Sequence, residues 1–358
     1  MPDQPHCLVI GAGIIGASIA WHLVRDGAHV TILDAGPGGG LATRHSWAWI
    51  NASWGNPEAY FRLRRQSMQE WRRLAQEVPE ISVNWSGGLL WDLPPERLES
   101  YASEHASWGY GIRLVDRVEA RRIEPQLADP PARAIHVAEE GAVEPLAAAE
   151  ALLHAAIARG AKFLPHREVT ALDLVGARIT GVSCGDDRVA ADLIVLAAGA
   201  ATDRLAMSAG IALPMSAPPG LLVVTKPAPP LLNGLVMAPE LHIRQRVDGC
   251  LIAGSDFGGA DPGTQPQAVA ERILSAMRTL LQDGDSLAFD HYTVGYRPLP
   301  GDEFPAIGFS QAHDNLYLAV THSGITLAPA IGAMAASEIL RGDRHPLLTP
   351  YGPARFGA

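Results

Sequence analysis

The sequence is poor in cysteine, and this shortage excludes two classes of protein. Its three cysteines are Cys7, Cys184 and Cys250, and no two of them have the CxxC spacing. An odd number of widely separated cysteines is typical of a reducing compartment and predicts no disulfide framework. It also excludes disulfide reductases, since those enzymes need a close redox-active cysteine pair.

Long apolar runs and clustered positive charge are also missing. No window holds about 18 uninterrupted apolar residues, so we expect no transmembrane segment. The N-terminal apolar run is broken by glycines and has no basic flank, so we expect no signal peptide and a cytoplasmic protein. The formal net charge is −10 at pH 7. A nucleic-acid partner is therefore not expected, because phosphate binding needs clustered positive charge. The histidines lack ligand spacing, so no metal site is expected either.

The pattern of a dinucleotide-binding unit occupies the start of the chain. An apolar run over 7–10 leads into Gly11, Gly13 and Gly16, and a second apolar run ends at Asp34. Gly11 allows a tight turn, Gly13 lets the backbone approach a pyrophosphate, and Gly16 lets the helix pack on the strand. The helix N-terminus would hold the diphosphate, and Asp34 a ribose hydroxyl. The alternative is a glycine turn in an ordinary βαβ unit.

The chain of 358 residues is long enough for two domains. The parallel α/β pattern of 1–82 returns over 141–214 and again over 298–358, whereas 83–140 and 215–297 have the pattern of a mixed sheet. We therefore predict an α/β fold with a discontinuous Rossmann-like domain and an inserted mixed-sheet domain. Nicotinamide-dependent dehydrogenases normally keep their Rossmann unit contiguous, so this layout favours a flavoprotein.

The expected elements follow from apolar periodicity and from glycine and proline boundaries. Strands are expected at 162–164, 168–174, 179–184, 193–196 and 316–320. Helices are expected at 57–77, 96–108, 145–160, 268–281 and 325–340. The first of these helices is rich in arginine, and we expect its arginines to form a solvated outer face rather than an anion site. These arginines are Arg62, Arg64, Arg65, Arg72 and Arg73.

Four blocks in this order along almost the whole chain resemble the D-amino-acid oxidase superfamily of FAD enzymes. The blocks are 11–34, 141–145 with the helix after it, 191–200, and 295–298 continuing through 327–329. The resemblance is closest to the branch that contains glycine oxidase, sarcosine oxidase and D-amino acid dehydrogenase. It implies that the Rossmann-like domain binds FAD, that the mixed sheet binds substrate, and that a carbon–nitrogen bond is oxidised. No cysteine lies where sarcosine oxidases attach flavin covalently, so the FAD is expected to be noncovalent.

The resemblance also implies a set of cofactor contacts. The family's glycine motif and acidic residue meet the diphosphate and ribose, and a loop after them lines the flavin. A later strand meets the adenine, and the start of the last helix faces the pyrimidine side of the flavin, where a helix N-terminus stabilises negative charge. The matching residues are Gly11, Gly13, Ile14, Ile15, Gly16, Asp34, Ala35, Thr43, Arg44, His45, Ser46, Val169, Ala198, Gly199, Ser323, Gly324, Ile325 and Thr326.

Three further residues match the substrate side of the family's site. Arg297 matches the arginine that holds the substrate carboxylate. Its planar guanidinium suits this task, because it can donate two parallel hydrogen bonds to a carboxylate. The alternative is a structural arginine that links a strand end to the domain interface. His242 falls where the relatives carry an active-site tyrosine, and a core or surface histidine is equally compatible. His322 is expected either to supply positive charge near the flavin or to brace its loop.

A group of tryptophans follows the flavin loop. Trp49 replaces a smaller residue beside the flavin, and Trp47 and Trp54 are close in sequence. They are expected either to line a pocket for an apolar or cyclic amine or to pack in the core.

The mechanism implied by the resemblance is hydride transfer from the substrate carbon to flavin N5, followed by hydrolysis of the imine. The expected substrate is a small molecule, an amino acid or amine, and the expected electron acceptor is oxygen or a carrier. Three alternatives stay open: a dehydrogenase that reduces a quinone or protein carrier, a flavin-binding subunit of a larger complex, and a nicotinamide-dependent dehydrogenase. Homo-oligomerisation is left open as well.

Overall fold

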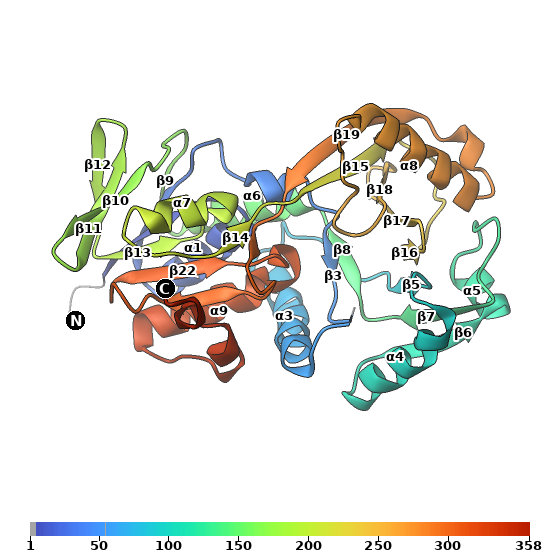
Figure 1. Cartoon of the computed structure of the whole chain (residues 1–358), viewed down its shortest axis with the longest axis horizontal. Helices are drawn as coiled ribbons and strands as arrows, with labels where there is room; N and C mark the ends of the chain where they lie inside the picture. Colours follow the sequence, from blue (N-terminus) through green and yellow to red (C-terminus); the bar gives the residue numbers. More distant parts are fainter. Residues whose placement is uncertain (1–4, 54) are drawn as a thin grey trace.

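Two large sheets lie at opposite ends of the molecule, with α3 (Glu58–Glu77) between them (Figure 1). The computed structural model describes residues 5–53 and 55–358. Within these two stretches, no helix is both long enough and apolar enough to cross a membrane. The α/β architecture with mixed sheets is the one expected from the sequence.

The first sheet has six strands in the order β21-β22-β13-β1-β2-β9. All neighbours are parallel except β21, which pairs antiparallel with β22 at the edge. The order reverses at β1, with β2 on one side and β13 on the other, and such a switch point opens a crevice at the carboxyl ends of the strands. The strands are β1 (His6–Ile10), β2 (His29–Leu33), β9 (Lys162–Leu164), β13 (Leu193–Leu196), β21 (Ala306–Phe309) and β22 (Leu316–Val320).

The second sheet has eight strands in the order β19-β15-β18-β17-β16-β5-β7-β6, mixed because β16 and β5 run parallel. Helix α8 (Pro266–Leu280) packs on β15, β17 and β18, while α4 (Pro95–Ser107) and α5 (Arg117–Ile123) pack near β6 and β7. The strands are β5 (Gly88–Leu90), β6 (Ile112–Asp116), β7 (Arg133–Val137), β15 (Pro219–Thr225), β16 (Leu235–Ala238), β17 (Leu241–Gln245), β18 (Leu251–Gly254) and β19 (Phe289–Tyr296).

Smaller elements complete the fold. A separate antiparallel sheet contains β10 (Ala171–Val175), β11 (Arg178–Cys184) and β12 (Asp187–Ala190), and its last, polar strand was not expected from the sequence. Two further small sheets have the strand orders β3-β8-β4 and β14-β20. Their strands are β3 (Trp49–Ile50), β4 (Val83–Asn84), β8 (Gly141–Val143), β14 (Met215–Ser216) and β20 (Leu299–Pro300). The remaining α-helices are α2 (Leu41–Arg44), α6 (Pro145–Ala158) and α7 (Thr202–Met207).

Helix α1 (Ile14–Arg25) packs tightly on α9 (Gly324–Arg341). The contact depends on Gly332, because a Cβ atom there would overlap the side chains of Ser18 and His22. The Ser18 hydroxyl donates to the carbonyl of Ala328 at 2.7 Å, and this bond fixes the register of the two helices.

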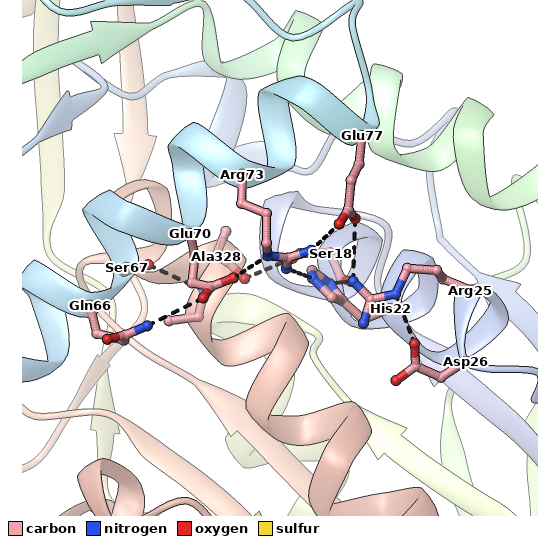
Figure 2. A network of polar contacts seen from close by, with 11 residues as sticks. Ser18, His22, Arg25, Asp26, Gln66, Ser67, Glu70, Arg73, Glu77 and Ala328 are labelled. Atoms are coloured by element: carbon pink, nitrogen blue, oxygen red, sulfur yellow. Dashed lines mark hydrogen bonds and ion pairs between the residues drawn. The ribbon is translucent and has the colours of Figure 1, made fainter.

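A polar network joins α1 to α3 (Figure 2). His22 lies 2.8 Å from the Ser18 carbonyl through Nδ1 and 3.1 Å from the Arg73 guanidinium through Nε2. A carbonyl only accepts and a guanidinium only donates, so the ring must be neutral, with its proton on Nδ1. Arg73 in turn donates to Glu70 and Glu77. Burial is the main cause that lowers the pKa of His22 to about 4.

We predict that acid destabilises the folded chain through His22. In the unfolded chain an ordinary histidine has a pKa of about 6.5, so it takes up a proton before the folded one does. The stability that neutral His22 contributes is therefore complete above about pH 6.5 and is lost as the pH falls towards 4. Urea denaturation at pH 7 and pH 5 tests this prediction. Between these pH values the free energy of unfolding of the parent protein should fall by about 2 kcal/mol more than that of His22→Gln.

The matched control is His154→Gln, which removes an exposed histidine from α6. Its pH dependence should follow that of the parent protein. Parallel curves for the parent and His22→Gln would mean that His22 is not the group that couples acid to unfolding.

Candidate active site

A cavity of about 1460 Å³ lies at the carboxyl ends of the central strands of the six-stranded sheet and reaches β15 and β19 of the eight-stranded sheet. The N-termini of α1 and α9 both reach it, because Ile15 and Gly324 line it. The two helix starts are adjacent: a Cβ atom on Gly324 would lie 3.6 Å from the Ile15 side chain. Since a helix N-terminus carries partial positive charge, this cavity is suited to anionic groups.

The three glycines of the N-terminal motif have different tasks. Gly11 has φ +101°, and a Cβ atom there would overlap the carbonyl of Ala197. A Cβ atom on Gly16 would overlap the carbonyl of Gly11, so Gly16 allows α1 to pack on the turn, and it does not line the cavity. A Cβ atom on Gly13 would overlap nothing and would make ordinary van der Waals contact with Thr43 Oγ1 at 3.5 Å and the Cα of Gly40 at 3.6 Å. Gly13 lines the cavity and presents backbone to it without a side chain.

Asp34 holds the turn that follows β2. Its carboxylate accepts hydrogen bonds from the backbone of Ala12 and of Gly36, both at 2.7 Å. The first of these donors lies inside the glycine motif, so Asp34 joins the motif to the next loop. A carboxylate has about four acceptor positions, and two remain for a ligand hydroxyl.

The loop between β2 and α2 is held in shape by its own side chains. The Thr43 hydroxyl accepts from the backbone N–H of Ile14 at 3.2 Å. The Arg44 guanidinium donates to the carbonyls of Gly38 at 2.9 Å and Gly40 at 3.1 Å. These bonds hold the loop in shape from within the chain itself.

The structure brings nearly all the predicted cofactor residues to this one cavity. They come from three separate parts of the chain, and only Gly16 is set back from the wall. Those that line the cavity are Gly11, Gly13, Ile14, Ile15, Asp34, Ala35, Thr43, Arg44, His45, Ser46, Val169, Ala198, Gly199, Ser323, Gly324, Ile325 and Thr326.

Arg297 follows β19 and lines the cavity. Its guanidinium lies against Gly258, where a Cβ atom would overlap Nη1, so a glycine is needed there. Nε is buried and has no hydrogen-bond partner among the described residues. None of the ion pairs among the described residues involves Arg297. Arg297 is partly buried and its charge is not balanced by an ion pair, so this side chain is available to an anionic ligand.

Aromatic side chains surround this part of the cavity. Trp49 lies 5.8 Å from Phe257 between ring centroids, and Phe257 lies 6.4 Å from His322. Trp47 packs edge-on against Trp49 at 6.0 Å and also lines the cavity. Trp54, the third tryptophan of this group, lies outside the described residues.

The orientation of Trp49 depends on Glu140, a residue that the sequence did not single out. Glu140 is fully buried and accepts from Trp49 Nε1 at 2.9 Å, from Ser53 Oγ at 2.6 Å and from the Tyr110 hydroxyl at 2.7 Å. Burial raises the pKa of Glu140 to about 7, although the three donors oppose the rise. No local pattern marks this residue, because its partners come from distant segments.

His322 lines the cavity without adding charge to it. Burial lowers the pKa of His322 to about 4, and the nearby guanidinium groups of Arg297 and Arg64 act in the same direction. Of the two interpretations of this residue, the lowered pKa disfavours a positive charge at neutral pH and leaves a brace for the loop as the prediction.

His242 is part of the core and is absent from the cavity wall. It is 2 % exposed, lies on β17 and forms an ion-pair contact of 2.6 Å with Asp92. Its ring stacks on Phe257 at 6.0 Å, so it supports the aromatic wall from behind. Of the two interpretations of this residue, the structure favours the core histidine.

Arg64 does not lie on the solvated face of α3, so that prediction is wrong for this residue. It is 7 % exposed and lines the cavity. Its Nη1 donates to Ser323 Oγ at 2.5 Å, just before the start of α9. The sequence did contain a signal, since Phe61, Arg64, Met68 and Trp71 follow helical spacing and all four are buried.

Comparisons with known proteins agree with this geometry. The family model described as DAO, FAD dependent oxidoreductase, matches residues 6–338. The chain is 25% identical to glycine oxidase of Bacillus licheniformis over 342 residues, which covers 93% of this chain and 92% of the relative. It is also 25% identical to one of the subunits of opine oxidase from Agrobacterium tumefaciens, covering 98% and 97% of the two chains.

The fold has a close counterpart among solved structures. Glycine oxidase of Geobacillus kaustophilus superimposes with a TM-score of 0.89 at 23% identity, covering 98% of this chain and 99% of that one. Since the family model spans nearly the whole chain, this protein belongs to the DAO family and is an FAD-dependent oxidoreductase that holds its cofactor noncovalently.

Proposed function

We propose that this chain oxidises the carbon–nitrogen bond of an amino acid or secondary amine, with Arg297 holding the substrate carboxylate. The observation that carries the proposal is the partly buried Arg297 side chain, which lines the aromatic end of the cavity and has no ion-pair partner among the described residues. The glycine oxidase relative, whose name gives glycine as its substrate, supports an amino acid substrate.

The cavity fits FAD along its length. The diphosphate would lie at the N-terminus of α1, beside the open face of Gly13, and the flavin pyrimidine at the N-terminus of α9. The side chains of Thr321 and His45 also line the wall, and their polar groups are of the kind that a cofactor can hydrogen-bond. Bound FAD supplies a hydride acceptor at flavin N5.

The protein's own contribution is orientation and exclusion of water. Arg297 would hold the carboxylate through two parallel hydrogen bonds and so direct the substrate carbon towards the flavin. Trp49 and Phe257 would shield that carbon from water and give the pocket an apolar side. Burial lowers the pKa of His322 to about 4, so at neutral pH it adds no positive charge beside Arg297. The neutral amine would give up hydride without a dedicated base.

A second candidate is the same chemistry carried out within a larger complex, in which this chain is the flavin-carrying component and electrons pass to a quinone or protein carrier. One observation favours it: the Agrobacterium relative is named as one of the subunits of an opine oxidase. Release of hydrogen peroxide during turnover of the purified chain would favour the oxidase, and its absence the carrier-linked enzyme.

The proposal is tested by an anaerobic reduction screen. The FAD-loaded protein is mixed with D-amino acids, N-methyl amino acids, glycine and cyclic imino acids, and the flavin absorbance is followed. At least one class should bleach the flavin. If none does while dithionite reduces it fully, the proposed function is wrong.

We predict that Gly13→Ala weakens FAD binding but leaves the fold intact. The backbone of Gly13 has φ −69° and ψ 177°, which alanine adopts freely, and the added methyl would contact Thr43 Oγ1 and the Gly40 Cα only at ordinary van der Waals distances. The Kd for FAD should rise about tenfold or more, since close backbone approach to the diphosphate is lost. Gly16→Ala is the comparison variant, and its methyl overlaps Gly11. It should lower the free energy of unfolding of the apoprotein by about 1–3 kcal/mol.

We predict that Arg297→Ala raises the substrate KM by about 100-fold, because two hydrogen bonds to a charged group are lost. The flavin spectrum should show that FAD stays bound. Gly258→Ala should raise KM in the same direction, because its methyl displaces the guanidinium. Arg272→Ala, which removes an exposed arginine from α8, is the control and should leave KM unchanged. An unchanged KM in Arg297→Ala would remove Arg297 from the substrate site.

A further inference from the structure

Arg64 is a buried cation that lines the cavity, and its guanidinium is held by three hydrogen bonds. It donates from Nε to the carbonyl of Asn51 at 3.0 Å, from Nη2 to Asn51 Oδ1, and from Nη1 to Ser323 Oγ at 2.5 Å. All three acceptors are neutral. The guanidinium is therefore held rigidly by the chain, while its positive charge is not balanced by these partners.

No carboxylate of the described residues forms an ion pair with Arg64. The positive charge of Arg64 acts on the buried carboxyl of Glu140 and limits the rise of its pKa. That carboxyl is occupied by its own three donors. A brace between Asn51 and Ser323 could be built from a neutral side chain, whereas arginine adds a buried charge that is costly without a counter-charge.

Arg64 and Arg297 thus line one cavity without ion-pair partners among the described residues, and the proposed reaction places two negative charges there. The substrate carboxylate accounts for Arg297. Hydride transfer breaks the substrate C–H bond and forms one N–H bond at flavin N5; both electrons of the broken bond pass to the flavin. The substrate leaves as a cationic imine, and the flavin gains one negative charge. Ser323, which Arg64 holds, lies at the helix N-terminus beside the expected pyrimidine ring.

We propose that Arg64 is a positioning residue that stabilises this negative charge, acting with Ser323 and the N-terminus of α9. This inference rests on the proposed function for where the flavin lies. Its effect is electrostatic, so it should raise the reduction potential of bound FAD and favour any anion formed on the ring.

The test measures two properties of the FAD-loaded protein that need no amino acid. One is the midpoint potential of bound FAD in a dye-coupled reductive titration. The other is the Kd for sulfite, which adds to oxidised flavin and places the same negative charge on the ring. In Arg64→Met the potential should fall and the sulfite Kd should rise at least tenfold, whereas Arg64→Lys should recover part of the loss.

Asn51→Asp covers the case in which Arg64→Met does not fold. It replaces an amide that already accepts from Arg64 with a carboxylate of the same shape, which neutralises the charge of Arg64 and loses only the long hydrogen bond, 3.4 Å, that Asn51 Nδ2 donates to the Ser53 carbonyl. It should shift both readouts in the same direction. The control is Arg62→Met on the solvent face of α3, where Arg62 pairs with Glu58; neither readout should change.

The proposal is overturned if FAD-loaded Asn51→Asp and any folded Arg64→Met keep the sulfite Kd within twofold of the parent. It is also overturned if Arg62→Met produces the same shift, since the effect would then be a general one of net charge. Because neither readout uses substrate, failure of every amine to reduce the parent protein would count against the proposed function alone.

Discussion

The close packing of α1 on α9 is the constraint on which the rest of the site depends. Gly332 lets the two helices approach, and Ser18 bonds the backbone of α9 across the contact. This contact brings the N-terminus of α9, from the end of the chain, beside the N-terminus of α1, from its beginning. The cavity therefore has two regions of partial positive charge, and the proposed function assigns one to the diphosphate and one to the flavin.

The charged groups of the cavity form a consistent pattern. Arg64 and Arg297 are held in place by neutral partners or by shape, and neither forms an ion pair among the described residues. His322 near them loses its proton because of burial and their field, which lowers its pKa to about 4. A site built in this way is unfavourable when it contains no anion, and it becomes favourable when anionic ligands bind.

Local features of this fold could be predicted from sequence, and features set by distant contacts could not. The unit from β1 to Asp34 was predictable because its glycines, apolar runs and carboxylate are contiguous. The periodicity of α3 places position 64 on its buried face, but the charge of the arginine led to the prediction of a solvated side chain. Glu140 had no such signal, since its partners Ser53 and Tyr110 meet it only in the folded chain.

A crystal structure of the FAD complex with a bound carboxylate inhibitor tests the central claim most directly. The account predicts the diphosphate beside Gly13, the flavin pyrimidine at the start of α9, and the carboxylate on Arg297 between Trp49 and Phe257. A flavin that lies away from the start of α9, or a carboxylate bound elsewhere with Arg297 turned to a protein partner, would contradict it.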